Sequence, residues 1–338
     1  MKPRNKLIGA AAAVVMVAGL VLPLGASASR ASNTVPGIVD IVTSLGLQGE
    51  AAAGTGIVLT SSGEILTNNH VIRGETKIHV TVLDSGKTYT GTVVGYSLAN
   101  DIAVVQLQNA SNLQTAALGS SSSVKTGDPV TGLGNAGGRG GAPSVATGKV
   151  LSLGQSLRVS DDQGGSEQLH GLIETNAPLQ PGDSGGPLTD ANGNVIGVDT
   201  AASSSFSFQS GVTRGFAIPI NHATAVAAEI VAGHKSATVH IGKTAYMGLS
   251  VLQPNDFFGQ PSSGITVAHV VPGSPTAKAG LTTGDVLKRF DGKVVNSPTA
   301  LTALVVTKYP GDTVPIRWVD AGGSSHTASL TLAAGPPQ

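Results

Sequence analysis

The chain has 338 residues, with 20 lysines and arginines, 20 aspartates and glutamates, and no cysteine. The lack of cysteine excludes disulfide bonds and thiol chemistry, and the lack of a basic excess argues against nucleic acid as a partner. Only 12 % of the residues are charged and 46 are glycine, so we expect short strands joined by turns and a mainly β fold.

The N-terminal 28 residues have the layout of a secretory signal peptide. Three basic residues lie within the first six positions, an uncharged stretch covers residues 7–25, and Ala26-Ser27-Ala28 offers a small-residue cleavage site. This pattern predicts a secreted or cell-envelope protein, and removal of residues 1–28 would leave a net charge of −3. An uncleaved membrane anchor is the alternative, because the stretch is about long enough to span a bilayer.

The next segment, residues 29–50, has no strand pattern and no aromatic residue. We therefore expect it to be flexible, and we do not expect a trimer to assemble through it. The possibility of another homo-oligomer stays open.

Residues 51–233 read as one β domain. Short apolar runs alternate with turn residues, which predicts an antiparallel barrel or a pair of barrels. The expected strands are 55–60, 77–83, 88–96, 102–107, 130–133, 145–153, 168–174, 195–200 and 215–218. Asp128 and Pro129 divide the domain into two lobes, residues 134–142 and 154–166 are expected loops, and a helix with Asn221 as its cap covers 221–232.

A second domain follows a linker at residues 234–243. The pattern predicts strands at 248–252, 264–271, 285–290 and 314–319 and a helix at 298–308, within a domain covering 244–334.

The serine in Gly182-Asp183-Ser184-Gly185-Gly186-Pro187 is the candidate nucleophile. Glycine admits backbone torsions that other residues avoid, so successive N–H groups can converge beside the hydroxyl. Donors aimed at a developing oxyanion are a large contribution to acyl-transfer catalysis. We expect Gly182, Ser184 and also Asp183 to supply them.

His70 and Asp101 are the expected base and its orienting acid. His70 follows the end of an apolar strand, where the scaffold can hold it beside a cleft. Asp101 begins an almost wholly apolar strand, where a carboxylate needs a partner. Asp183 and Asp199 are rival acids. The order histidine, aspartate, serine is that of chymotrypsin-type barrels. With no tight cluster of histidines and carboxylates, neither a metal nor another cofactor is expected.

These motifs resemble the HtrA (DegP-type) family of trypsin-fold serine proteases with one PDZ domain. The resemblance is carried by residues 67–72, 101–104, 182–187 and 215–219, and in the second domain by 246–249 and 284–287. It implies a chymotrypsin-like double antiparallel β-barrel followed by a PDZ domain. The implied activity is a secreted serine endopeptidase that cleaves unfolded or damaged proteins in protein quality control.

The resemblance also implies two binding sites. The substrate pocket maps to Leu179 and to Thr200, Ala201 and Ala202. Since no carboxylate is expected where it could attract a basic side chain, small to medium aliphatic residues should be preferred at the cleaved position. The PDZ domain should bind hydrophobic C-terminal peptides through Met247, Gly248, Leu249 and Val251. Rival functions are a mainly chaperone-like binding protein for unfolded polypeptides and a barrel-type esterase.

One residue departs from the family pattern. Family members commonly have asparagine immediately before the serine, whereas this chain has Asp183. We expect its carboxylate to be exposed or bonded to nearby backbone, because a buried unpaired carboxylate would be costly.

Overall fold

The computed structural model describes residues 36–45, 50–160, 166–200, 214–252 and 264–337. Several features expected from the sequence lie outside the described residues. They are the signal peptide, residues 29–35 and 46–49 of the N-terminal segment, and the pocket residues Ala201 and Ala202. In the described parts of the chain, no helix has the length and apolar character needed to cross a bilayer.

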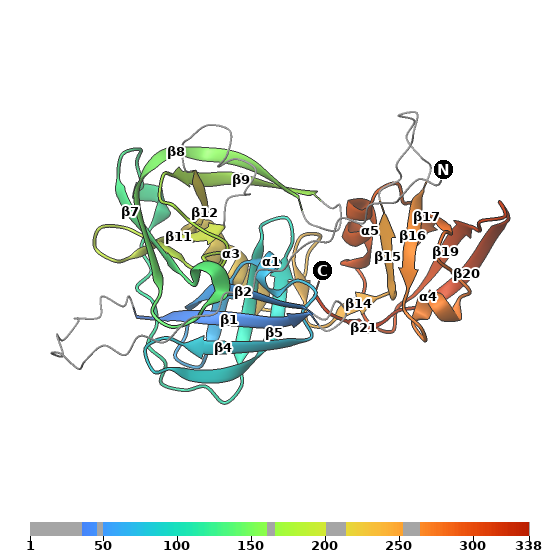
Figure 1. Cartoon of the computed structure of the whole chain (residues 1–338), viewed down its shortest axis with the longest axis horizontal. Helices are drawn as coiled ribbons and strands as arrows, with labels where there is room; N and C mark the ends of the chain where they lie inside the picture. The colour runs from blue at the N-terminus through green and yellow to red at the C-terminus, as the bar shows by residue number, and fades with distance from the viewer. Residues whose placement is uncertain (1–35, 46–49, 161–165, 201–213, 253–263, 338) are drawn as a thin grey trace, which may run out of the picture. The chain divides into compact units, whose positions relative to one another are not determined.

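Six strands close into a first barrel. They are β1 (Ile38–Leu45), β2 (Glu50–Val58), β3 (Glu64–Thr67), β4 (Lys77–Val82), β5 (Lys87–Ser97) and β6 (Ile102–Leu107). They follow the order β5-β4-β1-β2-β3-β6, and β5 also pairs with β6. Figure 1 labels β1, β2, β4 and β5 in its blue and cyan part. The short β13 (His240–Ile241) adds to β5.

The strand β1 corrects the expectation of a flexible segment before residue 51. It lies between β2 and β4, and its residues Ile38, Val39 and Ile41 are fully buried. The sequence Ile38-Val39-Asp40-Ile41 hides its strand pattern, because Asp40 interrupts an apolar run although its side chain is also buried.

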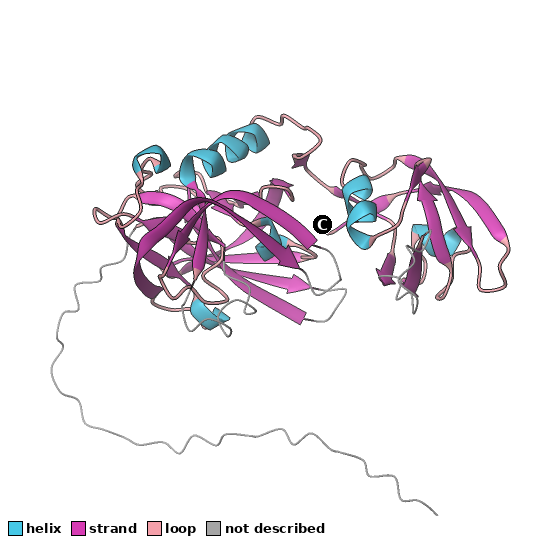
Figure 2. Cartoon of the chain, turned by 90° about the horizontal axis from the view of Figure 1, so that it is seen from above, coloured by secondary structure: helices cyan, strands magenta, loops and turns pink. Residues whose placement is uncertain are grey.

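A second closed barrel contains β7 (Pro129–Gly134), β8 (Ser144–Ser160), β9 (Ser166–Thr175), β10 (Pro187–Thr189), β11 (Val195–Thr200) and β12 (Gly215–Pro219). Its first strand begins at Pro129, where the division into two lobes was expected. The expected loop at 154–166 is wrong over much of its length, because β8 continues to Ser160 and pairs with β9. Strands dominate both barrels in Figure 2.

The helix α3 (Ile220–Val231) packs on a hydrophobic cluster that draws residues from both barrels. Its buried face includes Ile220, Ala223 and Ile230, which meet Leu66 of β3 and Val198 of β11 in that cluster. The expected cap is wrong: the helix begins one residue before Asn221, whose side-chain oxygen accepts a hydrogen bond from the Ser121 N–H.

The second domain has its own core. One sheet has the order β15 (Leu249–Leu252), β16 (Ile265–Val270), β17 (Val286–Phe290), β19 (Thr313–Val319) and β20 (Ser325–Thr331), with β18 (Lys293–Val294) on β17. The strands β14 (Thr244–Tyr246) and β21 (Ala333–Gly335) pair separately. Two helices, α4 (Pro275–Lys278) and α5 (Pro298–Val305), complete it. Each begins after a serine, Ser274 or Ser297, whose side chain caps the first turn.

Candidate active site

His70 lies on α1 (Asn69–Ile72), a single helical turn that follows β3. Its imidazole Nδ1 lies 2.9 Å from Asp101 Oδ2 and 3.0 Å from Oδ1. The His70 backbone N–H also donates to Asp101 Oδ1, at 3.0 Å. The histidine side chain is 42 % exposed and that of Asp101 is 5 % exposed, so a buried carboxylate anchors an imidazole that is itself partly exposed.

Asp101 is held by the turn between β5 and β6. Its φ of +50° is in the left-handed region, which aspartate tolerates better than most residues. Asn68 donates from its side-chain amide to the Asp101 carbonyl at 2.9 Å, and the Thr200 hydroxyl donates to Asp101 Oδ2 at 3.2 Å. A carboxylate with these donors is fixed in orientation, as the orienting role requires.

Ser184 lies in the nucleophile loop, which we define as Gly182–Gly186, between β9 and β10. Its carbonyl accepts a hydrogen bond from the Thr55 N–H of β2 at 2.8 Å. A Cβ placed on Gly54 would lie 2.7 Å from the side chain of Val71, the neighbour of His70, and 3.2 Å from the Ser184 carbonyl oxygen. The structure therefore brings the first barrel's His70 segment and the second barrel's nucleophile loop together at β2.

Thr55 links the two barrels, and the sequence analysis missed it. Its hydroxyl donates to the Gly182 carbonyl at 2.8 Å and accepts from the Asn135 N–H at 2.9 Å. Its carbonyl accepts from the Thr67 hydroxyl at 2.7 Å. The only signal in the sequence is a threonine between two glycines inside an expected strand.

The peptide groups of the nucleophile loop point in defined directions. The Pro181 carbonyl accepts from Gly137, and the Asp183 carbonyl accepts from Gly186. Because the C=O and N–H of a trans peptide point in opposite directions, the N–H groups of Gly182 and Ser184 point away from those partners. The Asp183 N–H donates to Gln180, which removes it from the expected set of oxyanion donors.

Asp183 is buried, and its carboxylate has two partners. Oδ2 accepts from the Gln180 N–H at 2.9 Å, and Oδ1 accepts from the Ser144 hydroxyl at 2.5 Å. The expected bond to nearby backbone is therefore present, and the expected exposure is not.

Two of the four expected pocket residues, Leu179 and Thr200, lie among the described residues, and their surroundings differ. Leu179 lies half-buried between Gly132 of β7 and Gly215 of β12, whereas Thr200 is buried with its hydroxyl on Asp101. The expectation that no carboxylate is placed to attract a basic side chain stays a prediction, but a fully buried carboxyl, that of Asp199, lies near Leu179. A Cβ on Gly132 would lie against Leu179 Cδ2 and 2.8 Å from Asp199 Oδ2, so these side chains are neighbours. Burial and the charge of Asp183 raise the pKa of Asp199 well above its usual value.

The PDZ residues cluster around the turn into β15. Gly248 has a φ of +86°, and a Cβ there would overlap Ser274. Its carbonyl accepts from the hydroxyls of Ser274 and Thr276. Met247 is buried, while Leu249 and Val251 pack half-buried against the domain core. Because β15 is the end strand of its sheet, one of its edges has no strand partner among the described residues.

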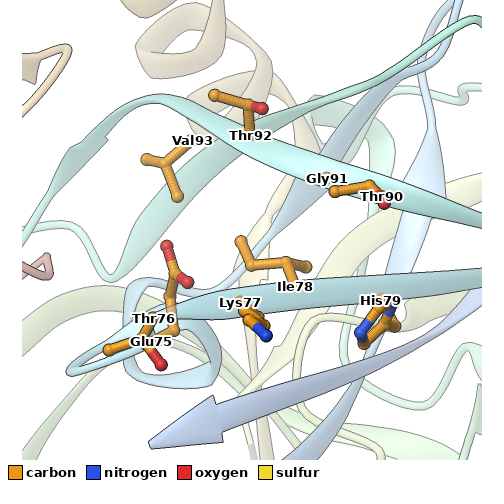
Figure 3. Close-up of a pocket in the computed structure, with 9 residues that line it drawn as sticks. All are labelled: Glu75, Thr76, Lys77, Ile78, His79, Thr90, Gly91, Thr92 and Val93. Carbon is orange, nitrogen blue, oxygen red and sulfur yellow. The ribbon is translucent and has the colours of Figure 1, made fainter. Parts of the chain in front are cut away.

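Figure 3 shows a separate cavity of about 450 Å³ on β4 and β5, lined by Glu75, Lys77, Ile78, His79 and residues 90–93 among others. None of His70, Asp101 or Ser184 lines it. The Glu75 carboxyl points toward the strand that carries Thr92 and Val93. Burial raises its pKa to about 7.

This pKa gives a stability prediction for Glu75→Gln. A carboxyl whose pKa is higher in the folded state than its usual value of 4.5 binds protons on folding, so stability falls as pH rises from about 4.5 to 7. Because the partial exposure of Glu75 reduces the effect, we expect a smaller change than full burial would give. The free energy of unfolding of the variant, relative to that of the parent, should rise by about 1–2 kcal/mol between pH 4.5 and 8. Thermal unfolding at both pH values measures this, and an equal pH response in both proteins would contradict it.

Comparison with known proteins shows which protein families and relatives this chain is similar to. Residues 54–198 match a family model for the trypsin-like peptidase domain, and residues 245–331 match one for the PDZ domain. Serine protease PepD of Mycobacterium tuberculosis is 36 % identical over 337 residues, which cover 96 % of this chain and 69 % of PepD. The periplasmic pH-dependent serine endoprotease DegQ of Escherichia coli is 33 % identical, and the match covers 78 % of this chain and 55 % of DegQ.

A solved structure, the HtrA-type protease AlgW with tripeptide, is 28 % identical with a TM-score of 0.52. The match covers 91 % of this chain and 96 % of that chain. The likeness therefore extends over both the barrels and the PDZ domain.

Proposed function

This chain belongs to the HtrA/DegP family of serine endopeptidases, and on that basis we propose that it is a secreted or cell-envelope protease that cleaves unfolded proteins. The observation that carries the proposal is the contact of His70 Nδ1 with both carboxylate oxygens of Asp101, at 2.9 and 3.0 Å. The relatives described as periplasmic and the signal-like N-terminus support the location.

In the proposed mechanism, Ser184 Oγ attacks the scissile carbonyl and His70 takes its proton. His70 then gives that proton to the leaving amine, and Asp101 keeps the imidazole in the correct tautomer and stabilises the imidazolium. The N–H groups of Gly182 and Ser184 bind the oxyanion. Water repeats the attack on the acyl-enzyme, with His70 again acting as base, and releases the second product.

The direct test of this proposal compares the cleavage of one substrate protein in its folded and unfolded forms. The same protein, offered once folded and once reduced and alkylated, should be cleaved only in the unfolded form, because a peptide bond must be extended to enter the site. Fragments are followed by mass spectrometry, with a short-chain ester as a second substrate. Efficient ester hydrolysis without any protein cleavage would favour an esterase.

Gly182→Ala tests the oxyanion loop. The φ of Gly182 is +102°, and a Cβ there would overlap the Asn135 carbonyl, so the loop must shift. We expect kcat/KM to fall about 100- to 1000-fold, the usual cost of one lost oxyanion donor. The control is Gly193→Ala, since Gly193 has a φ of +81° and a Cβ there meets nothing within 4 Å. Equal losses in the two variants would argue against this role.

We also propose that the PDZ domain binds a hydrophobic C-terminal peptide along β15. An extended peptide can pair with the edge of this strand, and the turn at Met247 and Gly248 can hold its carboxylate. The apolar side chains of Leu249 and Val251 suit an aliphatic last residue.

Gly248→Ala should weaken binding of a fluorescent peptide with a free carboxylate at least about tenfold, or about 1.4 kcal/mol, because the new Cβ overlaps Ser274. Gly280→Ala is the matched control, with a φ of +92° at Gly280 and open space around it. Fluorescence anisotropy measures both. Equal affinity for the amidated peptide would exclude carboxylate recognition.

A further inference from the structure

Asp199 of β11 holds the nucleophile loop by its backbone. Its carbonyl accepts from the Gly185 N–H at 2.8 Å, and its N–H donates to the Gly186 carbonyl at 2.7 Å. The next residue, Thr200, donates to Asp101. Two successive residues of one strand therefore support both the loop that carries Ser184 and the acid that orients His70.

An acidic side chain, such as that of Asp199, is unusual at a fully buried position of a strand that supports the site. Asp199 is 0 % exposed, and neither carboxyl oxygen has a hydrogen-bond partner among the described residues. Its surroundings are Gly132 of β7, the apolar Leu179 and, across the strand pair, Ala217 of β12. An ionised carboxylate without donors is very costly to bury, whereas a neutral carboxyl costs a few kcal/mol.

The charged group that acts on Asp199 is Asp183, and it is also acidic. Asp183 accepts hydrogen bonds from Ser144 and Gln180, whereas Asp199 has no such donor among the described residues. A second negative charge beside Asp183 is disfavoured. The two acids therefore differ in their contacts, because Asp183 accepts two hydrogen bonds and the buried Asp199 carboxyl accepts none among the described residues.

We propose that Asp199 is a positioning residue whose carboxyl must be protonated for β11 to hold the nucleophile loop and Asp101, and whose ionisation displaces them and lowers turnover. The inference rests on the proposed catalytic role of Ser184. Ionisation would draw water or a cation to the carboxylate, and the two backbone hydrogen bonds to Gly185 and Gly186 transmit the resulting shift.

The test is the pH profile of kcat/KM between pH 6 and 10 for the full chain and for Asp199→Asn, which is neutral at every pH. The parent should lose about tenfold per pH unit beyond the midpoint, as a single ionisation requires, and the variant should lack this loss. Asp190→Asn, in the β10–β11 turn, is the control and should keep it. An identical alkaline loss in the parent and in Asp199→Asn overturns the proposal.

A second measurement applies if Asp199→Asn does not fold. In the parent protein, the carboxyl ¹³C resonance of Asp199 should titrate with the same midpoint as the alkaline loss of activity. A resonance that titrates near the usual aspartate range overturns the proposal. Labelling of Ser184 by a fluorophosphonate separates a failure of the catalytic role of Ser184 from a failure of the Asp199 proposal. If neither labelling nor cleavage occurs at any pH, the catalytic role of Ser184 fails. If Ser184 is labelled but the pH profile of Asp199→Asn equals that of the parent, only the role of Asp199 is refuted.

Discussion

Replacing Ser184 with alanine is expected to lower kcat/KM for peptide cleavage by roughly a million-fold. The loss is this large because the hydroxyl is the proposed nucleophile, and the oxyanion donors alone give a small residual rate. The nucleophile loop keeps its backbone hydrogen bonds to Thr55 and Asp199, so the fold should be retained. Cleavage of an unfolded protein, followed over days for the variant, measures the ratio.

The control for this variant is Ser122→Ala, an exposed serine in the short helix η1 (Ser121–Ser123). It should cleave at the parent rate. A Ser184→Ala protein that retains even a tenth of the activity would place the nucleophile elsewhere. If the variant still suppresses aggregation of an unfolded protein, a binding function exists beside the proteolytic one.

The second large effect is expected for Asp101→Asn, with kcat lowered by about 10⁴. Asp101 receives donors from the His70 N–H, the His70 ring and the Thr200 hydroxyl. An amide would turn a donor toward at least one of them and favour the wrong imidazole tautomer. Asparagine tolerates the left-handed backbone, so the φ of +50° at Asp101 gives no separate reason for a loss.

Asp291→Asn is the matched control for that variant. Asp291 also has a φ of +50°, and it forms an ion pair with Lys308 in the second domain. The same substitution in the same backbone conformation should leave kcat unchanged. Steady-state rates with one peptide substrate compare the two, and similar losses would mean that the effect is not specific to the His70 contact.

The local sequence was enough to predict the contact between His70 and Asp101, because each lies where an apolar strand meets a polar turn. It was also enough to predict a division near Pro129, where β7 begins, and a separate second domain, which only the family resemblance identified as a PDZ domain. These features depend on patterns within a few residues, which strand periodicity and turn chemistry determine.

Other features depend on contacts between distant segments, and these were missed. Thr55 acts through hydrogen bonds with Gly182 and Asn135, which lie far away in the sequence. The strand β1 forms by pairing with β2 and β4. Asp199 was considered as a rival to Asp101, but nothing in its local sequence shows that its side chain is buried beside Leu179. The wrong loop at 154–166 has the same cause, since pairing with β9 overrides the glycine and polar residues in β8.

The hydrogen bonds of Thr55 also bear on when the enzyme first becomes active. Its hydroxyl partners, Asn135 and Gly182, follow it by 80 and 127 residues in the chain. A chain that is still being synthesised cannot form these bonds until the second barrel has been made and has closed. The nucleophile loop therefore lacks its hydrogen bonds to Thr55 until the second barrel has been synthesised, and we expect a chain that ends before that barrel is complete to be inactive.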